Sequence, residues 1–92
     1  MSASSNLESE PKEMLSDNLL VLRAKKGDQE AFEILWCRYA PKIRSMSSRF
    51  VRQPADAEDL TQETFLKAYC ALPGFRGQSQ FYSWLYAIAF NT

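Results

Sequence analysis

The clearest helical pattern in the chain is Asp56-Ala-Glu-Asp-Leu-Thr-Gln-Glu-Thr-Phe-Leu-Lys-Ala-Tyr-Cys-Ala-Leu72. Apolar residues recur in it every three or four positions, which is the spacing of a helix with one buried stripe. The stripe consists of Leu60, Thr64, Phe65, Ala68 and Leu72. Pro54 cannot continue a preceding helix, and Asp56 is well suited to the N-cap. The sequence therefore predicts an amphipathic helix from Asp56 to Leu72, stopped by Pro73-Gly74.

Two further helices are predicted before this one. Ser16 is suited to cap a helix from Asp17 to about Lys25, and Asp28 to cap a longer helix from Gln29 to about Arg52. The longer helix has Pro41 inside it, where we expect a kink. Its apolar stripe consists of Phe32, Leu35, Trp36, Tyr39, Ile43, Met46 and Phe50. Its cations are interpreted either as solubilising or as facing phosphate or a protein partner: Arg38, Lys42, Arg44, Arg49 and Arg52.

The C-terminal part combines a loop with a last helix. Glycine, proline and small polar residues indicate a loop over residues 73–80, and Ser79 is suited to cap a helix from Gln80 to Thr92. Because no helix-ending signal follows, we expect the chain to be cut inside this helix. Residues 1–14 are rich in Ser and Glu and are expected to form a disordered leader. The predicted fold is therefore all-α, a compact bundle of about four helices over residues 15–92.

Composition limits the functions that the chain can have. Its 92 residues allow one small domain. No apolar run approaches the roughly 18 residues of a membrane span, and no signal peptide is present, so we expect a cytoplasmic protein without membrane insertion. Cys37 and Cys70 stand alone in helical patterns and are interpreted as buried free thiols, with a disulfide or a metal pair as the alternative.

Charge is distributed unevenly although the net charge is zero. Residues 18–55 carry eight cations and three carboxylates, whereas residues 56–63 carry four carboxylates and no cation. This distribution indicates one surface for an anion and another for a basic or polar protein partner.

Catalysis is not expected, because the chain lacks the necessary residues. There is no histidine, no phosphate-binding glycine loop, and no dinucleotide turn. Asp59 and Glu63 form a carboxylate pair at i,i+4, but they lack the partner groups of a di-metal site. We therefore predict no enzyme, no metal and no cofactor. Aromatic residues mixed with cations beside a loop instead suit single-stranded nucleic acid.

Several motifs in order carry a family resemblance. They are Asp59-Leu60-x-Gln62-Glu63-x-Phe65-x-Lys67-Ala68-Tyr69, then Phe75-Arg76-Gly77, then Phe81-Tyr82-x-Trp84-Leu85-Tyr86. This run strongly resembles conserved region two of bacterial sigma factors, in particular the extracytoplasmic-function, sigma-E-like branch. The resemblance extends back to Leu15-Ser16 and to Lys26-Gly27-Asp28-x-x-Ala31-Phe32, so it covers residues 15–92. It implies a region-two fold without the second domain that recognises the more distant promoter element.

The resemblance implies a role in transcription initiation. Members bind core RNA polymerase at the clamp coiled coil of the largest catalytic subunit, and they recognise and melt the start-proximal promoter element on the non-template strand. The polymerase contact is carried over to Asp59, Gln62, Glu63 and Leu66. The DNA contact is carried over to Lys67, Ala71, Phe75, Arg76, Gln78, Ser79, Tyr82, Trp84, Tyr86, Ile88 and Asn91, with a purely structural Trp84 as the alternative. An anti-sigma factor is implied as a regulatory partner.

Two departures from the family pattern stand out. Cys70 and Ala87 occupy positions where close relatives often carry arginine, so we expect weaker phosphate contacts. The competing hypothesis is a helical protein-interaction module with no DNA role. A DNA-binding protein should lose base-specific binding, with its fold intact, when Phe75 or Asn91 is changed to Ala; an interaction module should bind no promoter strand selectively.

Overall fold

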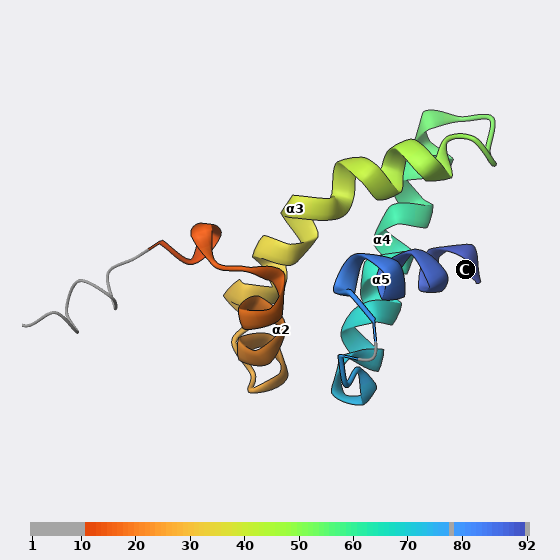
Figure 1. Ribbon diagram of the computed structural model, residues 1–92. Helices are drawn as coiled ribbons and strands as arrows, with labels where there is room; N and C mark the ends of the chain where they lie inside the picture. Colours follow the sequence, from red (N-terminus) through yellow and green to blue (C-terminus); the bar gives the residue numbers. More distant parts are fainter. Residues whose placement is uncertain (1–10, 78, 92) are drawn as a thin grey trace, which may run out of the picture.

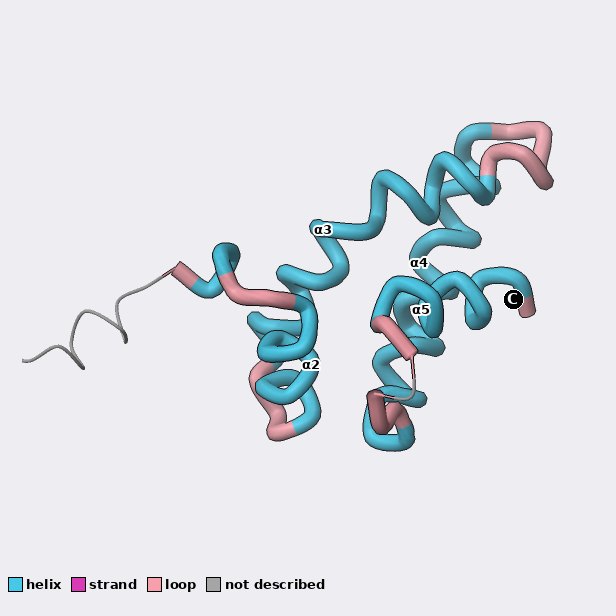
Figure 2. Tube along the Cα trace, viewed as in Figure 1, coloured by secondary structure: helices cyan, strands magenta, loops and turns pink. Residues whose placement is uncertain are grey.

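The computed structural model describes residues 11–77 and 79–91 (Figure 1). The part described contains helices and loops but no strand, which confirms the predicted all-α class and its four main helices (Figure 2). The elements in chain order are η1 (Lys12–Met14), α2 (Asp17–Lys25), α3 (Gln29–Ser47), α4 (Pro54–Ala71), η2 (Leu72–Gly74) and α5 (Phe81–Phe90). None of the described helices is both long and apolar enough to cross a membrane.

The N-terminal segment is already tied to the bundle before residue 15. Residues 1–10 of the predicted leader lie outside the described residues, but Lys12–Met14 form a short 3-10 helix. The Lys12 ammonium lies 2.9 Å from Asp28 Oδ2 and 3.0 Å from Glu30 Oε1. These contacts hold η1 against the start of α3.

Two of the predicted helix caps are confirmed. Ser16 Oγ accepts a hydrogen bond from the Leu19 amide, and Asp28 Oδ1 accepts one from the Ala31 amide, each at 3.3 Å. Such bonds satisfy amides that have no partner inside the first turn. Gly27, at φ 102°, makes the tight link between α2 and α3 in a conformation that favours glycine.

The other two predicted caps are wrong. α4 begins at Pro54, with Gln53 as its N-cap, so Asp56 lies inside the first turn. Proline suits this position because its fixed φ is helical and its missing N–H is not needed there. α5 begins at Phe81 with Gln80 as its N-cap, and Ser79 makes no cap bond. Thr92, the end of the predicted last helix, lies outside the described residues.

The end of α3 also differs from the prediction. The helix passes through Pro41 without interruption but stops at Ser47, and residues 48–50 form a turn. Ser48 Oγ donates to the Ser45 carbonyl at 2.8 Å, a local bond that competes with continued helix. Phe50 is therefore 64% exposed instead of continuing the buried stripe.

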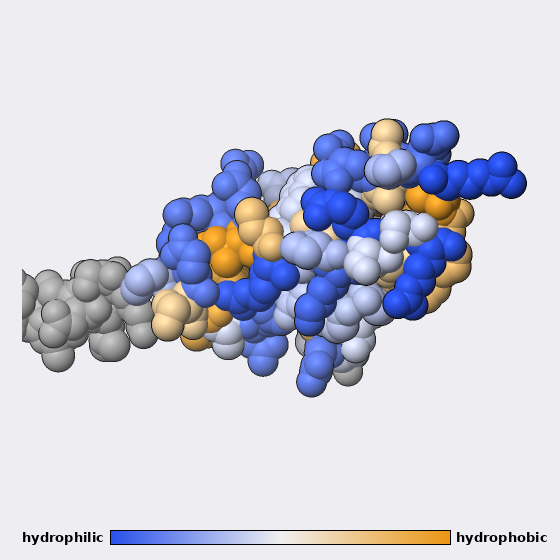
Figure 3. Space-filling view, turned by 90° about the horizontal axis from the view of Figure 1, so that it is seen from above, coloured by the Kyte–Doolittle hydropathy of each residue, from blue (hydrophilic) through white to orange (hydrophobic). Residues whose placement is uncertain are grey.

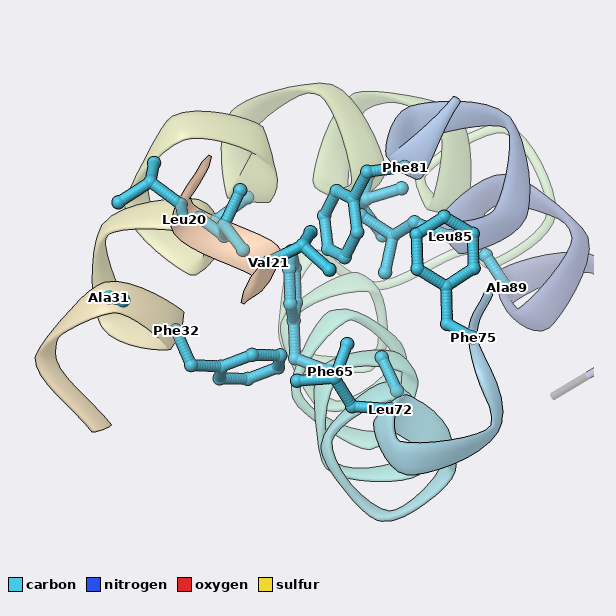
Figure 4. Close-up of a cluster of buried hydrophobic side chains, with 14 of the residues drawn as sticks. Leu20, Val21, Ala31, Phe32, Phe65, Leu72, Phe75, Phe81, Leu85 and Ala89 are labelled. Carbon is cyan, nitrogen blue, oxygen red and sulfur yellow. The ribbon is translucent and has the colours of Figure 1, made fainter. Parts of the chain in front are cut away.

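The core lies where α3 packs on α2, α4 and α5 (Figure 4). Its large, fully buried apolar side chains come from all four helices: Leu20, Leu35, Ile43, Phe65, Phe81 and Leu85. Burial of one such side chain stabilises the fold by about 1.5–3 kcal/mol. Thr61 and Thr64 are buried as well, and their hydroxyls donate to the Ala57 and Leu60 carbonyls at 2.7 and 2.8 Å.

The arrangement leaves much of α4 and α5 uncovered. α2 lies beside the first part of α3, while α5 packs on α4 (Figure 1). Seen from above, the molecule is mostly hydrophilic, and hydrophobic side chains gather mainly in two separate places (Figure 3). Cys37 and Cys70 are free thiols as predicted, but both are exposed, which corrects their expected burial. They lie on the outer sides of α3 and α4, where the apolar stripe does not reach.

Candidate functional site

The outward face of α4 presents a compact polar surface. Asp59, Gln62, Glu63 and Leu66 are all exposed there, at the three- and four-residue spacing of one helix face. Leu66 is 58% exposed and adds an apolar side chain to this face. Glu63 also pairs with Lys67 one turn later, at 3.6 Å. The four residues expected to contact polymerase therefore lie together and accessible.

A shallow hollow continues from this face toward the end of α4. It is lined by Glu63, Leu66, Lys67, Cys70 and Ala71. The hollow therefore brings two residues of the expected polymerase set next to Lys67 and Ala71 of the expected DNA set. Cys70 lies between them because it follows Leu66 and Lys67 by four and three residues on the same helix face.

Phe75, to which the family resemblance carried over a DNA contact, has a buried side chain. It is only 4% exposed, and its ring centroid lies 6.2 Å from that of Phe81 (Figure 4). The centroid of the Trp84 ring is 4.7 Å away. Its carbonyl accepts a hydrogen bond from the Lys25 ammonium at 2.5 Å. Phe75 thus anchors the loop to the core and to α2, and does not present a ring to solvent.

The loop after Phe75 is open to solvent. Arg76, Gly77 and Ser79 are exposed, and Gly77 adopts φ 77°, which favours glycine at the point where the chain turns. Gln78, another expected DNA contact, lies outside the described residues.

α5 divides its expected DNA residues between two faces. Tyr82 and Tyr86 lie on the side of α3, with the Tyr82 ring stacked on Tyr39 at 5.1 Å. Trp84 and Ile88 lie on another side and pack, partly buried, against the core. Asn91 is exposed at the end of the helix, where its Nδ2 donates to the Ala87 carbonyl at 3.0 Å. The expected DNA residues therefore form two groups instead of one continuous patch.

Tyr39 and Tyr82 remain neutral at physiological pH. Burial, together with the neighbouring Tyr86, raises the pKa of Tyr82 to about 12. Burial and a hydrogen bond to the Asp17 carboxylate likewise raise the pKa of Tyr39 to about 12. Phenols in this state donate hydrogen bonds and do not repel phosphate.

The cations of α3 and of the turn that follows it make different contacts. Arg38 donates to Asp17 Oδ1 at 2.7 Å and to the Glu13 and Leu15 carbonyls, so it holds the N-terminal segment. Arg44 donates to Glu58 at 2.6 Å and links α3 to α4. Lys42 and Arg49 instead border a groove together with Tyr86 and Phe90. The sequence pattern did not predict this groove, because it placed Phe50, which lies beside Phe90, in the core.

The described part of the chain offers no site for a metal ion. Within residues 11–77 and 79–91, no three side chains of the His, Cys, Asp and Glu types come close enough to hold one. The chemistry of the exposed surfaces is that of binding: carboxylates and an apolar side chain on α4, and aromatic rings with cations elsewhere.

Comparison with known proteins identifies the family. Residues 35–92 match the family model of sigma-70 region 2, and the chain belongs to this family. It is 54% identical over 80 residues to the ECF RNA polymerase sigma-E factors of Escherichia coli K12 and Salmonella typhimurium, covering 87% of this chain and 41% of each relative. It is 50% identical over 76 residues to the RNA polymerase sigma-H factor of Pseudomonas aeruginosa, covering 83% of this chain and 39% of that factor.

A solved structure supports the same assignment. It is the NMR structure of an engineered region 2 of sigmaE in complex with GTAAAA, which superposes with a TM-score of 0.78 at 43% identity and covers 99% of this chain and 84% of that one. The predicted region-two fold is therefore confirmed. The chain spans about two fifths of the length of the curated relatives that it matches.

Proposed function

We propose that this chain is the part of an extracytoplasmic-function sigma factor that binds core RNA polymerase and opens the start-proximal promoter element by holding its non-template strand. The observation that carries the proposal is the exposed face of α4, in a chain 54% identical to sigma-E factors. The solved relative bound to GTAAAA supports a DNA-facing role for the same fold.

The polymerase contact is assigned to Asp59, Gln62 and Glu63, with Leu66 at its edge. Their side chains are exposed, and the two carboxylates lie beside an apolar group that a partner would cover. Charge complementarity between such carboxylates and a basic partner gives an interface its specificity. The clamp coiled coil of the largest catalytic subunit is the proposed partner.

The DNA contact is assigned to the exposed surface that begins at the α4 hollow. Lys67 and Ala71 line the hollow, and the residues proposed to complete the DNA contact are Arg76, Gln78, Ser79, Ile88 and Asn91, with Tyr82 and Tyr86 as a second group on the α3 side of α5. A base leaves the duplex at a cost of a few kcal/mol, and a pocket that stacks and hydrogen-bonds it can supply that energy. Phe75 and Trp84 support this surface from beneath, since they pack on each other in the core.

The test of the polymerase contact is binding of the chain to the isolated clamp coiled coil. We expect the variant in which Asp59, Gln62 and Glu63 are all Ala to lose binding while its helical circular dichroism is unchanged, because these side chains are exposed. The matched control changes Glu13, Gln29 and Glu33 to Ala, which removes two exposed carboxylates and an amide elsewhere. Equal binding by both variants, or no binding by the native chain, would contradict the proposal.

A regulatory partner is proposed for the same α4 face. An anti-sigma factor that covers Leu66 and Tyr69, which are 58% and 45% exposed, would exclude polymerase from the neighbouring carboxylates. Such a partner would compete with the clamp coiled coil in a binding assay. With polymerase and promoter as partners, the proposed location is the cytoplasm.

A further inference from the structure

A groove separates the second half of α3 from α5. Its volume is about 420 Å³, and its lining includes Lys42, Met46, Arg49, Tyr86 and Phe90. We call it the α3–α5 groove. It lies on the Tyr82 and Tyr86 side of α5, away from the helix face that carries Trp84 and Ile88. Among the described residues assigned above to the DNA contact, Tyr86 alone lines this groove.

Aromatic rings follow one another along this side. Tyr82 and Tyr86 have centroids 4.3 Å apart, Tyr86 and Phe90 are 6.4 Å apart, and Phe90 and Phe50 are 6.1 Å apart. Phe50 and Phe90 are each 64% exposed although they are large and apolar. The row therefore ends in two rings with most of their surface accessible to a ligand.

The groove is positively charged. The charged side chains that line it are Lys42 and Arg49, and no carboxylate lines it. Within residues 11–77 and 79–91 neither cation forms an ion pair, whereas Arg38 and Arg44 both do. Lys42 lies 5.3 Å from the centroid of the Tyr82 ring, which orients its ammonium over the aromatic row.

We propose that the α3–α5 groove binds a second segment of single-stranded DNA, with bases stacked on Phe90, Phe50 and Tyr86 and phosphates held by Lys42 and Arg49. This inference rests on the proposed DNA role and extends it to a separate surface. Binding is independent of base sequence, because every base has a face to stack on and the groove offers few groups for recognition of base edges. An acidic protein segment is the other ligand that two cations would attract, but the aromatic row favours DNA.

The test uses the intact chain and a fluorescein-labelled oligothymidylate of about 12 nucleotides, within the usual range of single-strand site sizes. We expect Phe90→Ala to weaken binding about tenfold, the effect of losing one stacked base. The double variant Lys42→Gln/Arg49→Gln should lower the dependence of log K on log salt concentration by about 1.4, since each phosphate contact to a single strand contributes about 0.7.

Matched controls come from α2, which lies outside the groove. Leu22→Ala removes an apolar side chain that is 55% exposed, and Arg23→Gln/Lys26→Gln removes two exposed cations. Both should bind the oligonucleotide as the native chain does. Native affinity in Phe90→Ala and in the Lys42/Arg49 variant would overturn the inference, as would failure of the native chain to bind the oligonucleotide.

Two further results separate this inference from the proposed function. If the groove variants bind the oligonucleotide normally but no longer bind the clamp coiled coil, the groove is a protein interface and the inference is wrong. If the native chain binds the oligonucleotide through the groove but never binds the coiled coil, the polymerase role fails and the groove assignment stands.

Discussion

Phe75 combines a position in the loop predicted to contact DNA with a buried side chain. The sequence placed it in a loop between Pro73-Gly74 and Arg76, and the family resemblance carried a DNA contact over to it. The structure instead buries the ring between Phe81 and Trp84 and ties its carbonyl to Lys25. Phe75→Ala therefore removes core packing, and loss of DNA binding in that variant is not evidence of a base contact.

We predict that Phe75→Ala lowers the free energy of unfolding by about 3–5 kcal/mol, because a large buried ring leaves a cavity. Urea unfolding followed by helical circular dichroism measures the change. The control is Phe90→Ala, whose ring is 64% exposed and whose stability should lie within about 0.5 kcal/mol of the native chain. Equal stability of the two variants would show that Phe75 is not part of the core.

The starts of α2 and α3 could be predicted from local side-chain caps, whereas the end of α3 could not. Ser16 and Asp28 were identified as caps because each accepts a bond from an amide three residues later. The end of α3 was predicted too late in the chain, because the apolar stripe in the sequence continues to Phe50. The helix stops at Ser47, where the turn of residues 48–50 leads the chain back toward Pro54. The Ser48 hydroxyl bond to the Ser45 carbonyl and the packing of α3 against α4 accompany that reversal.

Substitution of Asp28 tests how much its side-chain cap stabilises the start of α3. Asp28→Ala should lower the free energy of unfolding, because it removes the N-cap bond to the Ala31 amide. The Lys12 ammonium holds the pKa of Asp28 below its ordinary value of 3.8, with a smaller contribution from the Ala31 amide. The contribution of the ionised carboxylate is therefore complete above pH 3.8 and is lost as the pH falls through the lower, folded-state pKa.

Thermal unfolding at neutral pH and in acid measures this dependence. The difference between the native chain and Asp28→Ala should shrink in acid. Asp28→Asn is the control, since it keeps a capping oxygen but does not titrate. A native-to-Ala difference that stays constant down to acid pH would show that the carboxylate charge contributes nothing.

At the scale of the whole molecule, one core joins the α2 side to the α5 side. Trp36 stacks on Phe65 at 4.9 Å, and Trp84 packs on Phe75 at 4.7 Å, so each tryptophan reports on a different part of that core. The buried cluster between them is continuous and draws on all four main helices. Elements that share one core are expected to unfold together.

We therefore predict that Trp36→Phe and Trp84→Phe, each with one tryptophan left, show a fluorescence transition that coincides with the loss of helical circular dichroism in the same variant. The comparison is made within each variant, because the two substitutions need not destabilise equally. A fluorescence midpoint separated from the circular dichroism midpoint in either variant would indicate that the α2 and α5 sides unfold independently.

The sequence by itself determined the helical class, the number of main helices, the family, and the exposed α4 face with Asp59, Gln62, Glu63 and Leu66. The helices and the exposed α4 face follow from residue spacing along single helices, which local hydrogen bonding and one-sided burial control. The family follows from the resemblance of several motifs in order. Only the tertiary structure decided that Phe75 is buried, that Cys37 and Cys70 are exposed, and that Lys42, Arg49 and Phe90 line one groove, with Phe50 beside Phe90. The physical reason is that burial and neighbourhood depend on how α3 and α5 pack against each other, which no local pattern specifies.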